Sequence, residues 1–203
     1  PNIKDKADKK YNFALLPYGP HFYTGILQSA GYLLLPEKKN LLFLLPQDIQ
    51  DDEIFQIDGT IGPLFGKQRT LPKHPKSWKT ISKIPQNIIE IIVQHLLFLD
   101  IITQTKYITC LAVGKDLSGS NQKKLAEYIH AHTTTTNIVF LTNVPADEGK
   151  KKAESIEKKQ GLLSLFHHIA KGNKKEVEVI AYSNAGNLGR NKGKGIKYAC
   201  MLA

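Results

Sequence analysis

Nearly continuous apolar runs alternate with longer segments of helical spacing along this chain. The runs predict strands buried on both faces of a sheet, and they occupy residues 11–17, 40–46, 106–114 and 137–143. Apolar residues at helical spacing predict helices over 21–35, 86–102, 118–132 and 146–173, the last interrupted near Gly161. Two further predicted strands, 176–183 and 193–203, are joined by a loop, which favours an antiparallel pair at one side of the sheet.

Strands that alternate with helices predict an α/β domain, with a mainly parallel buried sheet and helices on both faces. The 203 residues are enough for one sizeable core. We therefore expect one domain over 11–203, preceded by a flexible arm over 1–10, where no hydrophobic period is visible. Residues 51–79 are rich in Gly and Pro and predict short strands or a long excursion over the surface.

The composition is that of a soluble globular protein, with 41% hydrophobic and 23% charged residues. No apolar stretch approaches the roughly 18 residues that a membrane-spanning helix needs. We expect a cytoplasmic protein, but the only Met is Met201, so the chain has been trimmed or processed and a removed signal peptide stays open. Cys110 and Cys200 lie inside apolar runs, which favours buried free thiols over a disulfide.

The net charge of +10 is concentrated in the last quarter of the chain. Between Lys150 and Lys197, twelve basic residues stand against four acidic ones, or 12 − 4 = +8. A basic surface attracts phosphate polymers and anionic membranes, and the candidate residues are Arg190, Lys192 and Lys194 in an expected exposed turn. A Lys-rich solvated surface explains the same charge and is the interpretation we favour, so any nucleic-acid binding is expected to be weak and independent of sequence.

Reactive side chains follow three of the predicted strands. Ligands of open α/β sheets bind beyond the carboxyl ends of the strands, and the loops there, 18–23, 46–52 and 143–148, carry His21, Asp48, Asp51, Asp52, Asp147 and Glu148. An imidazole with carboxylates can hold a divalent ion or perform acid–base chemistry. Asp and Glu are also common caps of helices and turns, and for any one of these residues that interpretation is favoured.

An ordered set of motifs extends this picture over most of the chain. FALLPYGPHFYTGILQSAGYLLL, KNLLFLLPQDI, IDGTIGPLFGKQRT, QNIIEIIVQHLLFL, KYITCLAVGKDLSGSNQKKLAEYI, NIVFLTNVPADEG and VEVIAYSNAGNLGRNKGKGIKYACMLA follow one another from about residue 11. Together they resemble the motifs of the Memo family. The resemblance implies an α/β fold like that of the class III extradiol ring-cleaving dioxygenases. It also implies a site of His residues that binds metal in some members.

The residues of that implied site are mostly replaced in this chain. The resemblance places the vestigial family site at Tyr18, Asp48, Gln86, Asn87 and Asp147. Loss of imidazole removes the neutral nitrogen ligands that hold iron, copper or zinc. We therefore expect no metal and no cofactor, although a weakly bound divalent ion at Asp48 and Asp147 stays open.

Three functions fit the sequence. The favoured one is a catalytically degenerate scaffold that binds a protein partner. The first alternative is a divergent enzyme that acts on a small molecule with little or no metal. In such an enzyme His21 would be the base and Tyr23 the proton donor, with Glu90 and Asp147 nearby. If the enzyme does hold a metal, His21 and His95 are the substitute ligands. The second is a weak binder of nucleic acid or of an anionic surface. A pocket in which the reactive groups converge would favour the enzyme, and an exposed apolar patch would favour the scaffold.

Overall fold

The described part of the chain covers most of the predicted strands and helices. The computed structural model describes residues 9, 11–19, 21–38, 40–47, 52–57, 78–81, 86, 90, 91, 95, 107–114, 116–143, 161–184 and 197–203. For 21, 22, 47, 81, 107, 184 and 197 it describes the backbone alone.

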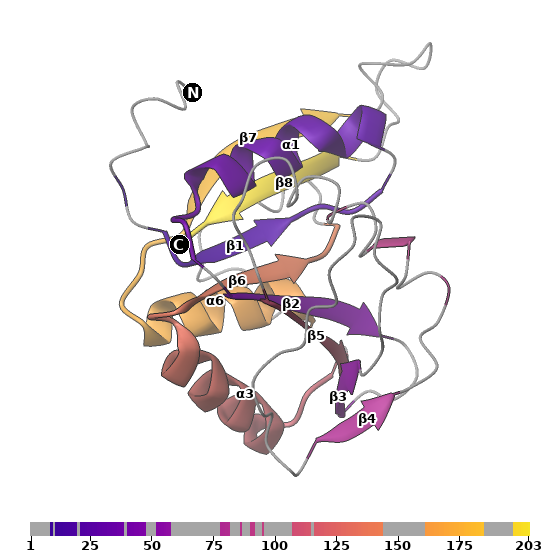
Figure 1. Cartoon of the computed structure of the whole chain (residues 1–203), viewed down its shortest axis with the longest axis vertical. Helices are drawn as coiled ribbons and strands as arrows, with labels where there is room; N and C mark the ends of the chain where they lie inside the picture. The colour runs from indigo at the N-terminus through magenta and orange to yellow at the C-terminus, as the bar shows by residue number, and fades with distance from the viewer. Residues whose placement is uncertain are drawn as a thin grey trace.

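Eight strands of the described residues form one mixed sheet (Figure 1). Their order across the sheet is β4-β3-β5-β2-β6-β1-β8-β7. The strands are β1 (Phe13–Leu16), β2 (Asn40–Gln47), β3 (Ile54–Ile57), β4 (Lys79–Ile81), β5 (Tyr107–Gly114), β6 (Thr136–Leu141), β7 (Glu178–Asn184) and β8 (Lys197–Leu202).

The centre of the sheet is parallel and its sides are mixed. Strands β5, β2, β6 and β1 run in one direction, and Phe43 of β2 pairs with Cys110 of β5 and Val139 of β6. At one side β8 is antiparallel to both β1 and β7, which confirms the predicted antiparallel pair. At the other side β3 is antiparallel to β5 and parallel to β4. The turn-rich segment thus contributes the two short strands β3 and β4.

Helices cover both faces of the sheet, as predicted. Helix α1 (His21–Leu34) lies over β1, β8 and β7, while α3 (Gly119–His132) and α6 (Leu162–Gly172) lie on the opposite face (Figure 1). Successive residues of each buried strand face opposite sides, so Ala14 and Leu16 join the core under α1 and Phe13 and Leu15 join the core under α3 and α6. Both faces being apolar explains why these strands read as unbroken hydrophobic runs.

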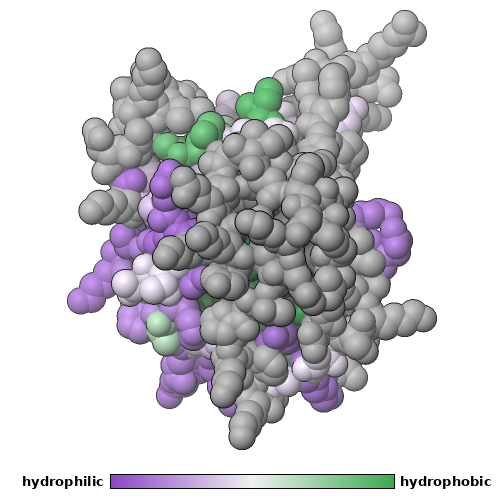
Figure 2. All heavy atoms as spheres, in the orientation of Figure 1, coloured by the Kyte–Doolittle hydropathy of each residue, from purple (hydrophilic) through white to green (hydrophobic). Residues whose placement is uncertain are grey.

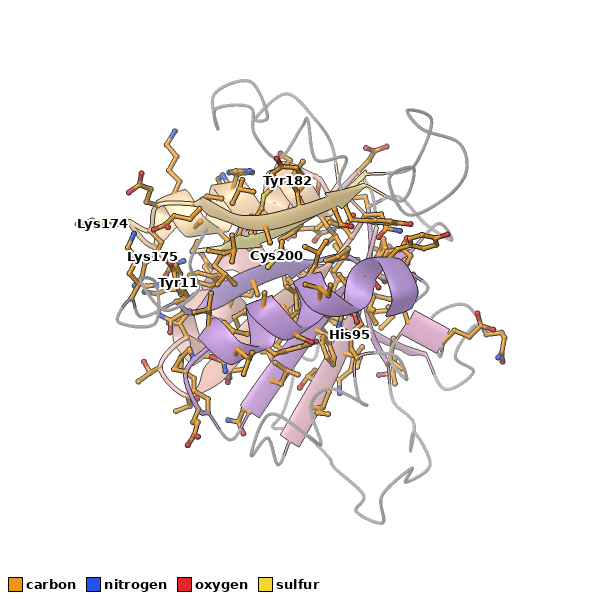
Figure 3. The ribbon with its side chains drawn as sticks, turned by 90° about the horizontal axis from the view of Figure 1, so that it is seen from above. Tyr11, His95, Lys174, Lys175, Tyr182 and Cys200 are labelled. Atoms are coloured by element: carbon orange, nitrogen blue, oxygen red, sulfur yellow. The ribbon has the colours of Figure 1, made fainter. Side chains whose placement is uncertain are left out.

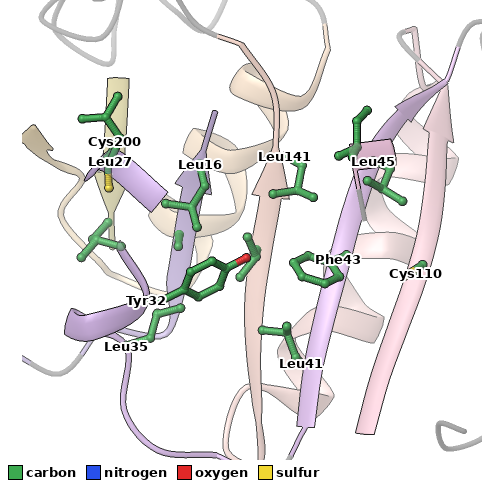
Figure 4. Close-up of a cluster of buried hydrophobic side chains, with 14 of the residues drawn as sticks. Leu16, Leu27, Tyr32, Leu35, Leu41, Phe43, Leu45, Cys110, Leu141 and Cys200 are labelled. Carbon is green, nitrogen blue, oxygen red and sulfur yellow. The ribbon is translucent and has the colours of Figure 1, made fainter. Parts of the chain in front are cut away.

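The first core lies between the sheet and α1 (Figure 4). It includes both cysteines, which are buried free thiols, as the sequence predicted. Burial raises the pKa of each thiol to about 12, so both stay protonated at neutral pH. The helical residues at 86, 90, 91 and 95 belong to the predicted helix 86–102, and Ile91 and His95 of this segment are buried.

Two of the described helices begin after a residue that suits a helix start. Ser118 caps α3 by accepting a hydrogen bond at Oγ from the Asn121 amide at 3.4 Å. Gly161 precedes α6 with a φ of 96°, a left-handed conformation that suits glycine. The part of the predicted helix that comes before Gly161 lies outside the described residues.

The expected N-terminal arm and the expected absence of a membrane-spanning helix can be compared with the described residues only. Of residues 1–10 the structure describes Lys9, whose ammonium pairs with Glu178 of β7; the rest of the expected arm lies outside the described residues. Within the described ranges, no helix combines the length and the apolar character needed to cross a membrane.

Candidate functional site

The loops that follow β1 and β6 lie side by side at the carboxyl edge of the sheet. The Thr142 amide donates to the Leu16 carbonyl at 3.1 Å, which extends the pairing of the two strands by one step. One residue on, the Tyr18 amide donates to Asn143 Oδ1 at 3.0 Å. The sequence predicted that the strand-end loops share one edge, and these two hydrogen bonds confirm it for the loops after β1 and β6.

The turn from β1 into α1 depends on Gly19. Its φ of 144° lies in the region that side chains with a Cβ rarely adopt. Space does not limit it, because a Cβ would lie 3.6 Å from Thr24 Cγ2 and 3.7 Å from Tyr198 Oη, both ordinary contacts. Thr24 Oγ1 donates to the Gly19 carbonyl at 3.2 Å, so the first turn of α1 holds the backbone of this turn in place.

Beneath this turn, α1 carries a line of buried polar side chains. Thr24, Gln28 and Tyr32 are spaced four residues apart and therefore lie on one side of the helix. Gln28 Nε2 donates to the Pro17 carbonyl at 3.0 Å and to Thr24 Oγ1 at 3.1 Å. The amide of Gln28 thereby ties the middle of α1 to the end of β1.

His95 joins this line from a position far along the chain (Figure 3). The imidazole is fully buried; its Nδ1 lies 2.7 Å from Tyr32 Oη and its Nε2 lies 3.4 Å from Gln28 Nε2. The tautomer of His95 decides which ring nitrogen donates and which accepts in these two contacts. The ring of Phe43 meets the imidazole edge-on at a centroid distance of 5.9 Å.

We call these four residues, Thr24, Gln28, Tyr32 and His95, the α1 clip. Burial, with smaller contributions from Cys110 and Cys200, raises the pKa of Tyr32 well above its usual value, so the phenol stays neutral. The hydrogen bonds of the clip join its members to one another and to the backbone of the β1–α1 turn. A buried polar network of this kind holds its members in fixed positions.

The structure describes only some of the predicted site residues. Tyr18 and Tyr23 are half-buried at the carboxyl edge and pack against the first core. Glu90 is exposed and accepts a hydrogen bond from Gln86 Nε2 at 3.3 Å, one helical turn away. His21 is the first residue of α1, with its backbone alone described. The other predicted positions lie outside the described residues, namely Asp48, Asp51, Asn87, Asp147, Glu148, Arg190, Lys192 and Lys194.

Asp52 has a structural role at the start of α3, where it binds the cap residue Ser118. Its carboxylate accepts hydrogen bonds from the Ser118 amide and from Asn121 Nδ2 at the start of α3. The bond from the Ser118 amide is the main cause that lowers the pKa of Asp52 below its usual value. The carboxylate thus ties the loop after β2 to the loop after β5. Among the residues described, no three His, Cys, Asp or Glu side chains gather where they could hold a metal ion.

The clip was largely missed by sequence reasoning, which considered only His95, as a substitute metal ligand. A signal did exist, because Thr24, Gln28 and Tyr32 recur every fourth residue along an otherwise apolar helix. Their partner lies 63 residues beyond Tyr32, and no local pattern specifies that contact.

The outer side of α1 is a second candidate site. Ile26 is 82% exposed and Leu33 is 61% exposed, and Ser29 lies between them half-buried. Spacings of three and four residues place the three side chains on one line, which we call the α1 stripe. The fourteen residues of α1 include no Asp, Glu, Lys or Arg. Figure 2 shows apolar surface at the top of the molecule, where α1 lies in Figure 1.

Comparisons with known proteins establish the fold and nothing finer. No protein-family model and no curated protein matches the chain. Among solved structures, the chain is similar to the uncharacterized protein JW3007 from Escherichia coli K12, with a TM-score of 0.53 and 8% sequence identity over 95% of this chain and 99% of that chain. At this identity the likeness shows an α/β fold alone, and the resemblance to the Memo family stays a prediction.

Proposed function

We propose that this chain is a protein-binding scaffold that presents the α1 stripe to a partner. The observation that carries the proposal is the exposure of Ile26 and Leu33 on a helix without a single charged residue. A helix that lies on the surface of a soluble protein normally carries charged residues on its outer side, whereas a helix that is apolar all round is normally covered on all sides. The composition of α1 is therefore that of a helix whose outer side is covered when the protein functions.

Helix α3 of the same chain shows the ordinary pattern. Of its fourteen residues only Leu125 and Ile129 are buried, and its outer side carries Lys123, Lys124 and Glu127. In α1, by contrast, most described side chains are buried and the few that are exposed are uncharged. The difference lies in the sequence of α1 itself and not in a general shortage of charge, since the chain has 28 Lys and Arg residues.

The energy available from the stripe is that of two anchor residues. Complete burial of a Leu or Ile side chain contributes about 1.5–3 kcal/mol. Scaled by exposures of 82% and 61%, Ile26 and Leu33 together offer about 2–4 kcal/mol to a partner that covers them. That is the contribution expected of the centre of a modest interface, surrounded by weaker contacts.

The inner side of α1 supports the same function. The polar groups beneath the β1–α1 turn are hydrogen-bonded to one another and to the turn, so the clip holds α1 against the sheet. A helix held in this way presents its outer side chains with little further loss of conformational freedom when a partner binds.

Site-specific photo-crosslinking in the native source tests the proposal. The photoreactive residue p-benzoylphenylalanine replaces Leu33, or, as the control, the exposed Thr134 beyond α3. We expect a discrete adduct from position 33, no such adduct from position 134, and loss of the adduct when Ile26→Lys is added. Absence of an adduct at position 33, or equal adducts from both positions, would overturn the proposal.

A metal-independent enzyme is the second candidate, because Tyr18 and Tyr23 bring two half-buried phenols to the carboxyl edge beside the Gly19 turn. This function predicts a small molecule that raises the melting temperature of the chain and fails to do so for Tyr23→Phe. The crosslinking result does not depend on that outcome, so the two candidates are tested separately.

A further inference from the structure

The large and small side chains of the α1 stripe follow nearly the same order when the helix is read in either direction. Ser29 stands three residues after Ile26 and four before Leu33, so a large apolar side chain lies on either side of a small one. In a twofold contact between identical chains, residue i of one copy meets residue j of the other and residue j meets residue i. Two α1 helices packed antiparallel about Ser29 would place Ile26 of each copy against Leu33 of the other.

We propose that the partner of the α1 stripe is the α1 stripe of a second copy of this chain, in an antiparallel contact with Ser29 at the twofold axis. The inference rests on the proposed function, because it names the occupant of the same surface. A small residue at the axis allows the two helices to approach to the roughly 8–10 Å typical of packed helices.

Charge favours α1 over the other described helices as the place of self-contact. With a net charge of +10, two copies repel each other over most of their surface. Helix α3 carries Lys123 and Lys124, and α6 carries Lys171 in its last turn. Among the described helices, α1 is the one on which two copies meet without bringing lysines together.

The ends of the helices add to this preference. In the antiparallel contact, the amino end of each α1 lies beside the carboxyl end of the other, so their opposite partial charges attract. The exposed Glu37 follows α1 by three residues, and the contact brings it toward the first turn of the second copy, where a carboxylate is stabilising.

The size of the stripe predicts a weak dimer. A standard specific interface buries about 800 Å² on each partner. The two exposed side chains of the stripe supply only a part of that, so the dissociation constant is expected in the high micromolar to millimolar range. The dimer should therefore form with rising concentration and not be permanent.

Sedimentation velocity from about 10 µM to about 1 mM is the first test. We expect the average mass to rise from 22.7 kDa toward twice that value with concentration. The variant Ile26→Lys with Leu33→Lys should stay monomeric. A control variant that adds the same charge elsewhere, Ala131→Lys with Thr134→Lys at exposed positions on and beyond α3, should dimerise nearly as the wild type does.

A cysteine at the axis provides the second test and does not disturb the anchors. Ser29→Cys should give a disulfide-linked dimer at the concentrations where the wild type associates, when diamide takes up the two electrons and two protons of the paired thiols. Cys110 and Cys200 are buried and do not compete. The control Ala131→Cys should form the dimer at least tenfold more slowly.

The outcomes separate the inference from the function on which it rests. A wild-type chain that stays monomeric up to about 1 mM, or a dimer that survives Ile26→Lys with Leu33→Lys, overturns self-contact at α1. If position 33 then still crosslinks to a protein of another mass in the native source, the scaffold function stands with a different partner. If position 33 crosslinks to nothing, both proposals fail.

Discussion

Replacing Gly31 by alanine should destabilise the protein, although alanine is the better helix former. Gly31 of α1 faces side chains of β1 and β8. A Cβ there would stand 2.3 Å from Leu16 Cδ2 of β1 and 3.3 Å from Cys200 Sγ of β8. The optimal separation of two carbons is about 3.5–4.0 Å, so the Leu16 contact is too short by about 1.2 Å or more. Either Leu16 changes its rotamer or α1 moves away from the sheet.

The magnitude follows from two opposing terms. Alanine in place of glycine in a helix interior gains about 1 kcal/mol. An extra methyl group in a well-packed core costs about 1–3 kcal/mol, and the upper part of that range applies because Leu16 is fully buried. We expect a net loss of about 1–2 kcal/mol, or a melting temperature lower by roughly 2–8 °C for a chain of this size.

Gly172 provides the matched control. It is the last residue of α6, and a Cβ at that position would meet nothing within 4 Å. Gly172→Ala should therefore gain up to about 1 kcal/mol. Urea unfolding followed through the fluorescence of Trp78, which is buried, gives both free energies of unfolding on one scale.

A double-mutant cycle identifies the contact that is responsible. Leu16→Ala alone should cost about 2–5 kcal/mol because it leaves a cavity. In the Gly31→Ala background the cost should fall by about 1 kcal/mol or more, since the shortened side chain relieves the overlap. If Gly31→Ala stabilises the chain as much as Gly172→Ala does, the close packing of α1 on β1 is refuted.

Further measurements test the buried groups and the helix ends. Cys110 and Cys200 should not react with a thiol reagent at pH 8 in the folded chain, because burial raises each pKa to about 12. The stability that each thiol contributes is complete below about pH 9 and is lost as the pH rises toward 12, by about 1.4 kcal/mol per pH unit. Urea titrations at several alkaline pH values would show this loss, and an unchanged stability would contradict it. Asp52→Asn should lower stability at neutral pH, because the lowered pKa of Asp52 gives stability above about pH 4 that is lost as the pH falls through the folded pKa. The stability of the variant should therefore fall less steeply in acid than that of the wild type. Acid titrations in which the two stability curves run parallel would refute this. His95→Phe keeps an aromatic ring but leaves the Tyr32 hydroxyl without this partner, so we expect a loss of about 1–3 kcal/mol in urea unfolding, and a neutral result would show that the clip does not hold the fold. Lys174 has a φ of 55°, so Lys174→Gly should raise stability by about 1 kcal/mol, and a loss would show that the side chain makes a stabilising contact.

The buried centre of the sheet could be predicted from the sequence because both of its faces are apolar. Strands β1, β2, β5 and β6 are hydrophobic runs, so each could be predicted from its own residues without knowing which strands lie beside it. Strands β3 and β4 have four and three residues, within a stretch rich in Gly and Pro, and their existence depends on pairing with β5 and with each other. The order of the eight strands depends likewise on contacts between distant segments.

The sites were less predictable than the fold for a similar reason. The polar residues of the clip could be counted along α1, but their acceptors are a carbonyl at the end of β1 and an imidazole far along the chain. The stripe was hidden differently. The polar residues Thr24 and Gln28 are the buried ones and the apolar Ile26 and Leu33 are exposed, which reverses the pattern from which an outer side is normally read. Ile26 and Leu33 are identified as the outer residues only because the opposite side of α1 packs on β1, β8 and β7.

The clip and the stripe are two sides of one helix, and their roles depend on each other. An exposed apolar side chain binds best when its position is already fixed, because the entropy of ordering it then does not oppose association. Thr24, Gln28 and Tyr32 fix α1 through hydrogen bonds that no solvent can replace in the buried core. Tyr182, the other large apolar side chain exposed among the described residues, faces the opposite side of the sheet on edge strand β7, since its partner Ala199 belongs to the core under α6. Ile26 and Leu33 together expose more apolar surface than this single side chain, which is why we place the interaction surface on α1.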